Sequence, residues 1–185
     1  MEASMLIPEA SGEPADEPRE MTLTVMFTDI EGSTALNERL GDEAWVELVL
    51  MHNEIVRDRV WRLGGREVKF RGDGFMVVFD DPVDAARCAI SIQRVLADVV
   101  ERYSKIELPV RLGLHHGRVL RAFDEVVGAA VNVAEQVMSA ASGGQILASG
   151  DFRAAVAHEN IDFGDSVDVD GRRAYPLSWR GPLAA

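Results

Sequence analysis

The chain has 185 residues, of which 47% are hydrophobic, and it carries 19 Lys and Arg against 31 Asp and Glu, a formal net charge of −12. Its length is typical of one domain, and its hydrophobic content excludes a chain that is disordered throughout. The negative charge disfavours anionic partners, and no long basic run offsets it. We therefore expect neither nucleic acid nor a membrane surface as a partner.

The amino-terminal segment and the single cysteine, Cys88, indicate a cytoplasmic protein. One cysteine cannot form an intramolecular disulfide, and its spacing favours a small core residue. The start of the chain lacks the basic and apolar regions of a secretory signal, and no apolar run approaches the ~18 residues of a membrane span. Residues 1–20 hold six acidic residues, one arginine and three prolines, which predicts a disordered tail before a domain at 21–185.

From residue 21 onward, strand-like runs and helical periodicities alternate. Apolar residues recur at helical spacing between Asp42 and Leu63, and Asp81-Pro82 has the cap and first-turn proline of a helix that runs to about Tyr103. The Gly72-Asp73-Gly74 turn lies between two apolar runs and predicts a β-hairpin. The expected strands are residues 23–30, 68–71, 75–79, 110–115, 145–149 and two within 161–179 joined at 170–171. One expected helix begins at residues 32–34, and the others cover 42–63, 82–103 and 128–141.

The resulting order is β-α-α-β-β-α-β-α-β-α-β-β, which predicts an α/β or α+β domain built in layers. A hairpin inside this series argues against a wholly parallel sheet. It therefore argues against a receiver-type signalling domain, which also uses an acidic pocket and a lysine.

Two aspartates lie where they could serve chemistry. Asp29 ends the first strand directly before a Gly-Ser-Thr turn, and Asp73 lies between two glycines in the hairpin. Carboxylates are suitable ligands for hard divalent cations, and the backbone N–H groups that open a helix suit a phosphate. Each signal alone is weak, because aspartate is common in turns, and the chain has no Walker A loop. Together they suggest a nucleoside triphosphate.

Three motifs in order give a more specific indication. Residues 27–34 (FTDIEGST), 69–75 (KFRGDGF) and 128–134 (GAAVNVA) resemble the class III nucleotidyl cyclase catalytic domain, and the resemblance covers about residues 21–180. It implies an α+β fold with ferredoxin-like βαββαβ layers and extra C-terminal strands. It also implies a head-to-tail homodimer, in which each site takes its metal half from one chain and its asparagine half from the other.

The resemblance also implies roles for individual residues. Asp29 and Asp73 would bind two divalent ions, Mg²⁺ or Mn²⁺, Lys69 would read adenine, and Asn132 would orient the ribose. The substrate would then be ATP, and the products cyclic AMP and pyrophosphate. The backbone that would contact the triphosphate belongs to Ile30, Glu31, Gly32, Ser33 and Thr34.

Two positions depart from the family pattern. Glu125, beside Asp124, stands where adenylyl cyclases usually carry the Asp that reads the base. At the position of Lys69, guanylyl cyclases typically have Glu instead. Gln136 stands where the family has a transition-state arginine. Loss of one such donor typically costs about 3–4 kcal/mol, a rate factor of roughly 10²–10³. The candidates for a substitute charge, which the sequence does not rank, are Arg71, Arg121, Arg153, Arg172 and Arg173.

The sequence therefore predicts a slow adenylyl cyclase and leaves two alternatives open. One is a catalytically impaired nucleotide-binding or dimerisation module of the same fold, and the other is a cyclase for another nucleotide. The adjacent His115 and His116 are not expected to share a metal, because neighbouring residues on a strand point to opposite faces.

Overall fold

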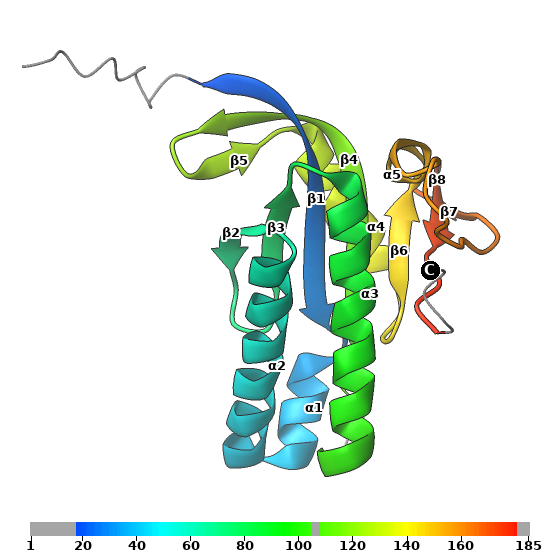
Figure 1. Cartoon of the computed structure of the whole chain (residues 1–185). Helices are drawn as coiled ribbons and strands as arrows, with labels where there is room; N and C mark the ends of the chain where they lie inside the picture. Colours follow the sequence, from blue (N-terminus) through cyan, green and yellow to red (C-terminus); the bar gives the residue numbers. More distant parts are fainter. Residues whose placement is uncertain (1–17, 105–107, 181–185) are drawn as a thin grey trace, which may run out of the picture.

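The structure, a computed structural model, describes residues 18–104 and 108–180. One mixed sheet has the strand order β2-β3-β1-β4-β6-β8-β7, and β5 pairs with β4 outside this path (Figure 1). The strands are β1 (Arg19–Ile30), β2 (Arg66–Phe70), β3 (Phe75–Phe79), β4 (Val110–Ala122), β5 (Glu125–Val127), β6 (Ile146–Ser149), β7 (Val167–Val169) and β8 (Arg172–Pro176). The helices are α1 (Ser33–Leu40), α2 (Asp42–Arg62), α3 (Pro82–Val99) with a π-helical turn at Val100–Ser104, α4 (Ala129–Ala140) and α5 (Gly150–Ala155).

Residues 19–122 form the predicted ferredoxin-like unit. Strands β1 to β4 lie in the order β2-β3-β1-β4, and the β1–β3, β2–β3 and β1–β4 pairs are all antiparallel. Strand β6 then adds to β4 in parallel, and β8 and β7 extend the edge. The antiparallel β2–β3 hairpin excludes the parallel receiver-type sheet, so the predicted α+β fold is confirmed.

Apolar side chains cover both faces of the sheet. Helices α2 and α3 pack on one face (Figure 1), where Met26, Val56 and Ile92 are fully buried in the larger core. Helix α4 packs on the other face through Ala130 and Ala134. A strand buried on both faces cannot alternate polar and apolar residues, which explains the continuous apolar run that ends at Asp29.

The structure corrects several boundaries. Strand β1 begins at Arg19 and not at Leu23, so Arg19 and Glu20, which we assigned to the tail, pair with β4. The rest of the predicted tail, residues 1–17, lies outside the described residues. The third helix ends at Val99, where the π-helical turn takes over.

The largest difference from the prediction is the long strand β4. It continues past His115 to Ala122 and turns back into β5, which the sequence did not predict. Gly117 and charged residues interrupt the apolar pattern there, but pairing with the equally long β1 keeps the strand extended. No helix in the described part of the chain is long and apolar enough to cross a membrane.

Candidate active site

A cavity of about 470 Å³ opens between the end of β1, the β2–β3 hairpin and α4. Its lining includes four residues predicted to carry function, Asp29, Lys69, Asp73 and Asn132. These side chains come from three segments that are distant in the sequence. The fold therefore brings the two predicted metal ligands, one base-reading residue and the ribose-orienting asparagine to one place.

Asp29 is held by an arginine that the sequence analysis missed. Arg111 stands opposite Asp29 in the β1–β4 register, and its Nε and Nη2 donate to Asp29 Oδ2 at 2.9 and 2.6 Å. The remaining terminal nitrogen donates to the Ser139 carbonyl near the end of α4 at 3.2 Å. The sequence signal was one charged residue in the apolar run 110–114, but its partner on β1 depends on strand register.

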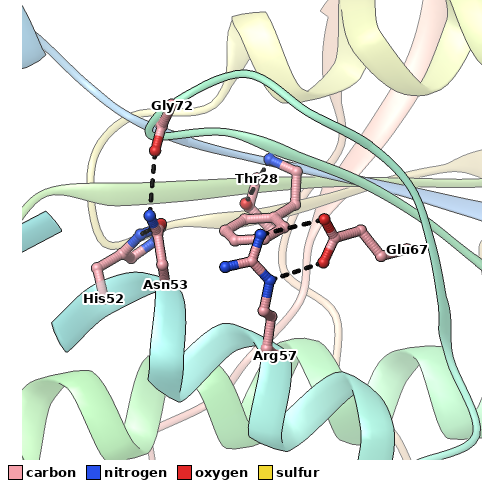
Figure 2. Close-up of polar contacts among 7 residues, drawn as sticks. Thr28, His52, Asn53, Arg57, Glu67 and Gly72 are labelled. Carbon is pink, nitrogen blue, oxygen red and sulfur yellow. Dashed lines mark hydrogen bonds and ion pairs between the residues drawn. The ribbon is translucent and has the colours of Figure 1, made fainter. Parts of the chain in front are cut away.

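Asp73 lies in a turn pressed against the end of β1. Arg71 N–H donates to Gly74 O at 2.9 Å and closes the turn, with Gly72 at φ +75°, a conformation that favours glycine. A Cβ at Gly74 would lie 2.9 Å from the Thr28 carbonyl, so only glycine permits this approach. Phe75 N–H also donates to Thr28 Oγ1 at 3.2 Å (Figure 2). These contacts place Asp73 beside the strand that carries Asp29.

The two aspartates fit a metal bound mainly through phosphates. Within residues 18–104 and 108–180, no three His, Cys, Asp or Glu side chains gather as a metal site. Mg²⁺ commonly takes one or two carboxylates and completes its shell with water and substrate phosphates. A pair of carboxylates beside a cavity of about 470 Å³ therefore suits Mg²⁺ or Mn²⁺ that arrives with a nucleotide.

The two predicted base-reading residues already contact each other. Lys69 Nζ on β2 lies 2.7 Å from Glu125 Oε2 on β5, and both side chains are exposed. Lys69 lines the cavity and Glu125 does not. The pair presents a cation and a carboxylate at the cavity rim, which can donate to and accept from one nucleobase edge.

The predicted phosphate loop borders the site without lining the cavity. Gly32 caps α1 at φ +66° with no side-chain bond to the first turn, so the N–H groups of Ser33 and Thr34 keep their capacity for an anion. Glu31 Oε2 accepts from Gly143 N–H at 2.8 Å and ties the loop to the turn after α4. The Ile30 side chain is buried, so this residue can offer only its backbone.

Gln136 lies one turn beyond Asn132 on α4, in a neighbouring hollow. Asn132 and Glu135 line both spaces, whereas Gln136 lines only the second, together with Asp168 and Asp170. Among the five arginines considered as substitutes, Arg71 lines the main cavity. Arg153 instead packs over the rings of Phe163 and Tyr175.

The two adjacent histidines have separate hydrogen-bond partners. His115 Nδ1 lies 2.8 Å from Ser149 Oγ, and His116 Nδ1 lies 2.9 Å from Thr24 Oγ1. Burial lowers the pKa of both imidazoles. Cys88 is buried too, and burial raises the pKa of its thiol to about 12, so it is an inert core residue.

The comparisons with known proteins decide the family. The family model described as the adenylate and guanylate cyclase catalytic domain matches residues 16–177. The chain belongs to this family. An adenylate cyclase of Neurospora crassa is 34% identical to this cyclase domain over 172 residues, which are 80% of the chain and 7% of that protein. The chain spans less than a tenth of the fungal adenylate cyclases it matches.

Solved structures show the same fold. The adenylyl cyclase CyaB from P. aeruginosa has a TM-score of 0.77 and 26% identity, covering 88% of this chain and 96% of that one. The guanylyl cyclase Cya2 has a TM-score of 0.76 and 25% identity, covering 88% and 93%. Because neighbours of both kinds fit this cyclase domain about equally, overall shape does not select the base.

Proposed function

We propose that this cyclase domain converts ATP to 3′,5′-cyclic AMP and pyrophosphate. One observation carries the proposal: Asp29 and Asp73 line the same cavity as Lys69 and Asn132, so each chain carries both the metal half and the asparagine half that the sites of a dimer would use. The reaction forms a bond from the ribose 3′-oxygen to the α-phosphorus and breaks the bond from that phosphorus to the α,β-bridging oxygen. The hydroxyl proton passes to solvent and pyrophosphate leaves.

The residues divide the work by position. Asp29 and Asp73 would hold two divalent ions, Mg²⁺ or Mn²⁺, which when bound would acidify the 3′-hydroxyl and neutralise the leaving pyrophosphate. Lys69 and Glu125 would read the adenine edge, and Asn132 would orient the ribose. The backbone from Ile30 to Thr34 would bind the triphosphate. Catalysis would rest on orientation and charge stabilisation.

Gln136 makes the proposed enzyme slow. A neutral amide supplies no positive charge to the transition state, and this residue lies outside the main cavity. The same observation supports the second candidate, a nucleotide-binding module without turnover. Arg71 lines the cavity beside Lys69 and belongs to the turn at residues 71–74 that carries Asp73, here named the metal turn; it could supply part of the missing charge.

We also propose a homodimer with shared sites, located in the cytoplasm, where ATP is available. The β4–β5 hairpin extends away from the core (Figure 1) and exposes 37% of Leu120, 64% of Phe123 and 44% of Val127. Leu120 and Val127 are direct cross-strand partners, so their side chains share one face of the hairpin. Contiguous exposed apolar residues of this kind typically mark a protein interface.

The test is product formation. Purified protein is incubated with Mn²⁺ and ATP, GTP, CTP or UTP separately, and cyclic products are identified by mass spectrometry beside an Asp29→Ala control. Cyclic AMP that disappears in the control supports the proposal. A different cyclic nucleotide overturns the roles of Lys69 and Glu125. No product, together with Mn²⁺-dependent thermal stabilisation by ATP, supports the binding module.

A further inference from the structure

Helix α2 sends two adjacent polar side chains into the protein beneath the metal turn. His52 is fully buried and Asn53 is 6% exposed, although the same helix buries Leu48, Val56 and Val60 in the apolar core. Buried polar groups are costly unless they are hydrogen-bonded. This pair therefore calls for an explanation that apolar packing does not give.

Asn53 contacts the peptide bond that leads into Asp73. Its Nδ2 donates to the Gly72 carbonyl at 3.2 Å (Figure 2). The N–H on the other side of that peptide, from Asp73, donates to the Arg71 carbonyl at 2.9 Å. A peptide unit is planar, so fixing its oxygen and its N–H fixes its orientation. The direction in which the Asp73 side chain leaves the backbone follows from that orientation.

His52 in turn orients the Asn53 amide. Its Nδ1 lies 3.0 Å from Asn53 Oδ1 (Figure 2). Because the amide nitrogen donates to Gly72, the amide oxygen is the acceptor, and His52 Nδ1 must carry the proton. Burial lowers the pKa of His52, which keeps the ring neutral. A reversed amide would place oxygen against oxygen at Gly72.

Burying His52 and Asn53 lowers the stability of the fold, and their contacts with the turn at Asp73 account for their presence. His52 Nε2 is buried and has no hydrogen-bond partner among the described residues. The His52 ring centroid also lies 6.0 Å from that of Phe75, on the strand after the turn. Both ends of the Asp73 turn therefore contact the same stretch of α2.

We propose that Asn53 is a positioning residue for the metal ligand Asp73, with its amide fixed by His52. The inference rests on the proposed function, because it gives Asp73 a metal to bind. Neither residue touches the substrate in this arrangement. Residues that orient a metal ligand typically contribute roughly 10- to 100-fold to metal affinity.

The test is Mn²⁺ binding, measured from the electron paramagnetic resonance signal of free Mn²⁺ in titrations of the full chain. Asn53→Leu keeps the branched shape and the number of side-chain heavy atoms and removes the donor, and we expect it to weaken Mn²⁺ binding at least about tenfold. Glu67→Gln is the matched control, because it breaks the exposed Arg57–Glu67 ion pair on the same hairpin (Figure 2) without touching the turn. Asp73→Asn identifies how much of the binding depends on Asp73.

Each outcome decides between positioning and its alternatives. Weaker binding in Asn53→Leu with unchanged binding in Glu67→Gln supports the proposal. Unchanged binding in Asn53→Leu, or equal losses in both variants, overturns it, since the second result reports only hairpin stability. Wild-type binding that Asp73→Asn does not weaken overturns the metal site itself, and with it this inference.

A second variant and a second readout keep the test independent of folding. If Asn53→Leu does not fold, His52→Phe leaves Asn53 in place and frees its amide to reverse, and we expect a several-fold loss of Mn²⁺ affinity. In a cyclase assay, a positioning role raises the Mn²⁺ concentration for half-maximal rate while the rate at saturating Mn²⁺ recovers. A rate that stays low at saturation, with an unchanged half-maximal concentration, overturns the positioning role.

Discussion

Arg111 and Asp29 face each other across β4 and β1, and the guanidinium donates two hydrogen bonds to one carboxylate oxygen. A cation thus already occupies one side of a proposed metal ligand. Because both hydrogen bonds go to Oδ2, a divalent ion can bind through Oδ1, but the guanidinium competes for the charge of the same carboxylate. When a nucleotide is bound, the guanidinium would also lie beside the triphosphate, whose charge it can offset.

Replacing Arg111 should separate these two effects. In Arg111→Gln, Mn²⁺ binding without nucleotide should tighten about fivefold, which corresponds to the roughly 1 kcal/mol of a partly exposed ion pair. The KM for ATP should rise, because the triphosphate loses a cation. Titrations of Mn²⁺ and steady-state kinetics measure the two quantities. Weaker Mn²⁺ binding in the variant would show that Arg111 orders Asp29 and does not compete for it.

The second prediction concerns the neutral residue on α4. Gln136→Arg should raise kcat with Mn²⁺ and ATP by about 10- to 100-fold, because a charged donor stabilises the pyrophosphate-releasing transition state. The acidic neighbours Asp168 and Asp170 in the same hollow can hold the introduced guanidinium. Ser139→Arg, which adds the same charge to that hollow from another position, is the matched control.

Equal rates in the two arginine variants would mean that the added positive charge raises the rate regardless of its position in the hollow. An unchanged rate in Gln136→Arg would indicate that another cation already serves the transition state. Arg71 is then the residue to replace, because it lines the cavity beside the metal turn.

The sequence motifs identified the residues that line the cavity better than the residues that hold them in place. Asp29 and Asp73 were found from the residues themselves, at a strand end and in a glycine turn, whereas Lys69 and Asn132 were assigned through the resemblance to the cyclase family. The hairpin followed from its glycine turn, and the ferredoxin-like arrangement of the first four strands followed from the resemblance. In the structure all four line one cavity of a single chain.

The parts that the sequence did not show depend on contacts between distant segments. Arg111 meets Asp29 through strand register, and Asn53 meets Gly72 through the packing of α2 on the hairpin. The β4–β5 extension depends on pairing with β1, which overrides a weak local pattern. A single sequence shows the periodicity along one helix or strand. It does not show which residue of another helix or strand will contact it.

The third prediction is a loss of stability in mild acid. Burial lowers the pKa of His52, His115 and His116 below the ordinary value of about 6.5. Between the folded and unfolded pKa values the unfolded state binds more protons, so the free energy of unfolding decreases as pH falls below about 6.5. The full contribution is present above that pH.

Urea unfolding at several pH values between 7.5 and 5 measures this slope. His52→Leu should make the slope shallower, because leucine takes up no proton in either state. A slope that is unchanged in His52→Leu would show that the other two histidines carry the pH dependence. A free energy of unfolding that rises as pH falls through this window would contradict the predicted direction.

The last prediction concerns whether the residues of one active site come from one chain or from two. Asp29 and Asn132 line one cavity of a single chain, whereas the exposed hairpin residues Leu120, Phe123 and Val127 favour a partner chain. Asp29→Ala and Asn132→Ala chains should each be inactive alone. If a site takes its aspartates from one chain and its asparagine from the other, a mixed dimer holds one intact site of two. Random mixing makes half of the dimers mixed, so about a quarter of the wild-type rate should return in the mixture and about half in purified mixed dimers.

Differently tagged chains, purified through both tags, verify the mixed dimer before the assay. Phe123→Asp on both chains is the interface control, because a charge at the exposed hairpin tip should prevent association and remove the rescue. No rescue in verified mixed dimers would mean that each chain completes its own cavity. The exposed hairpin would then join two independent sites, and the activity per chain would not depend on protein concentration.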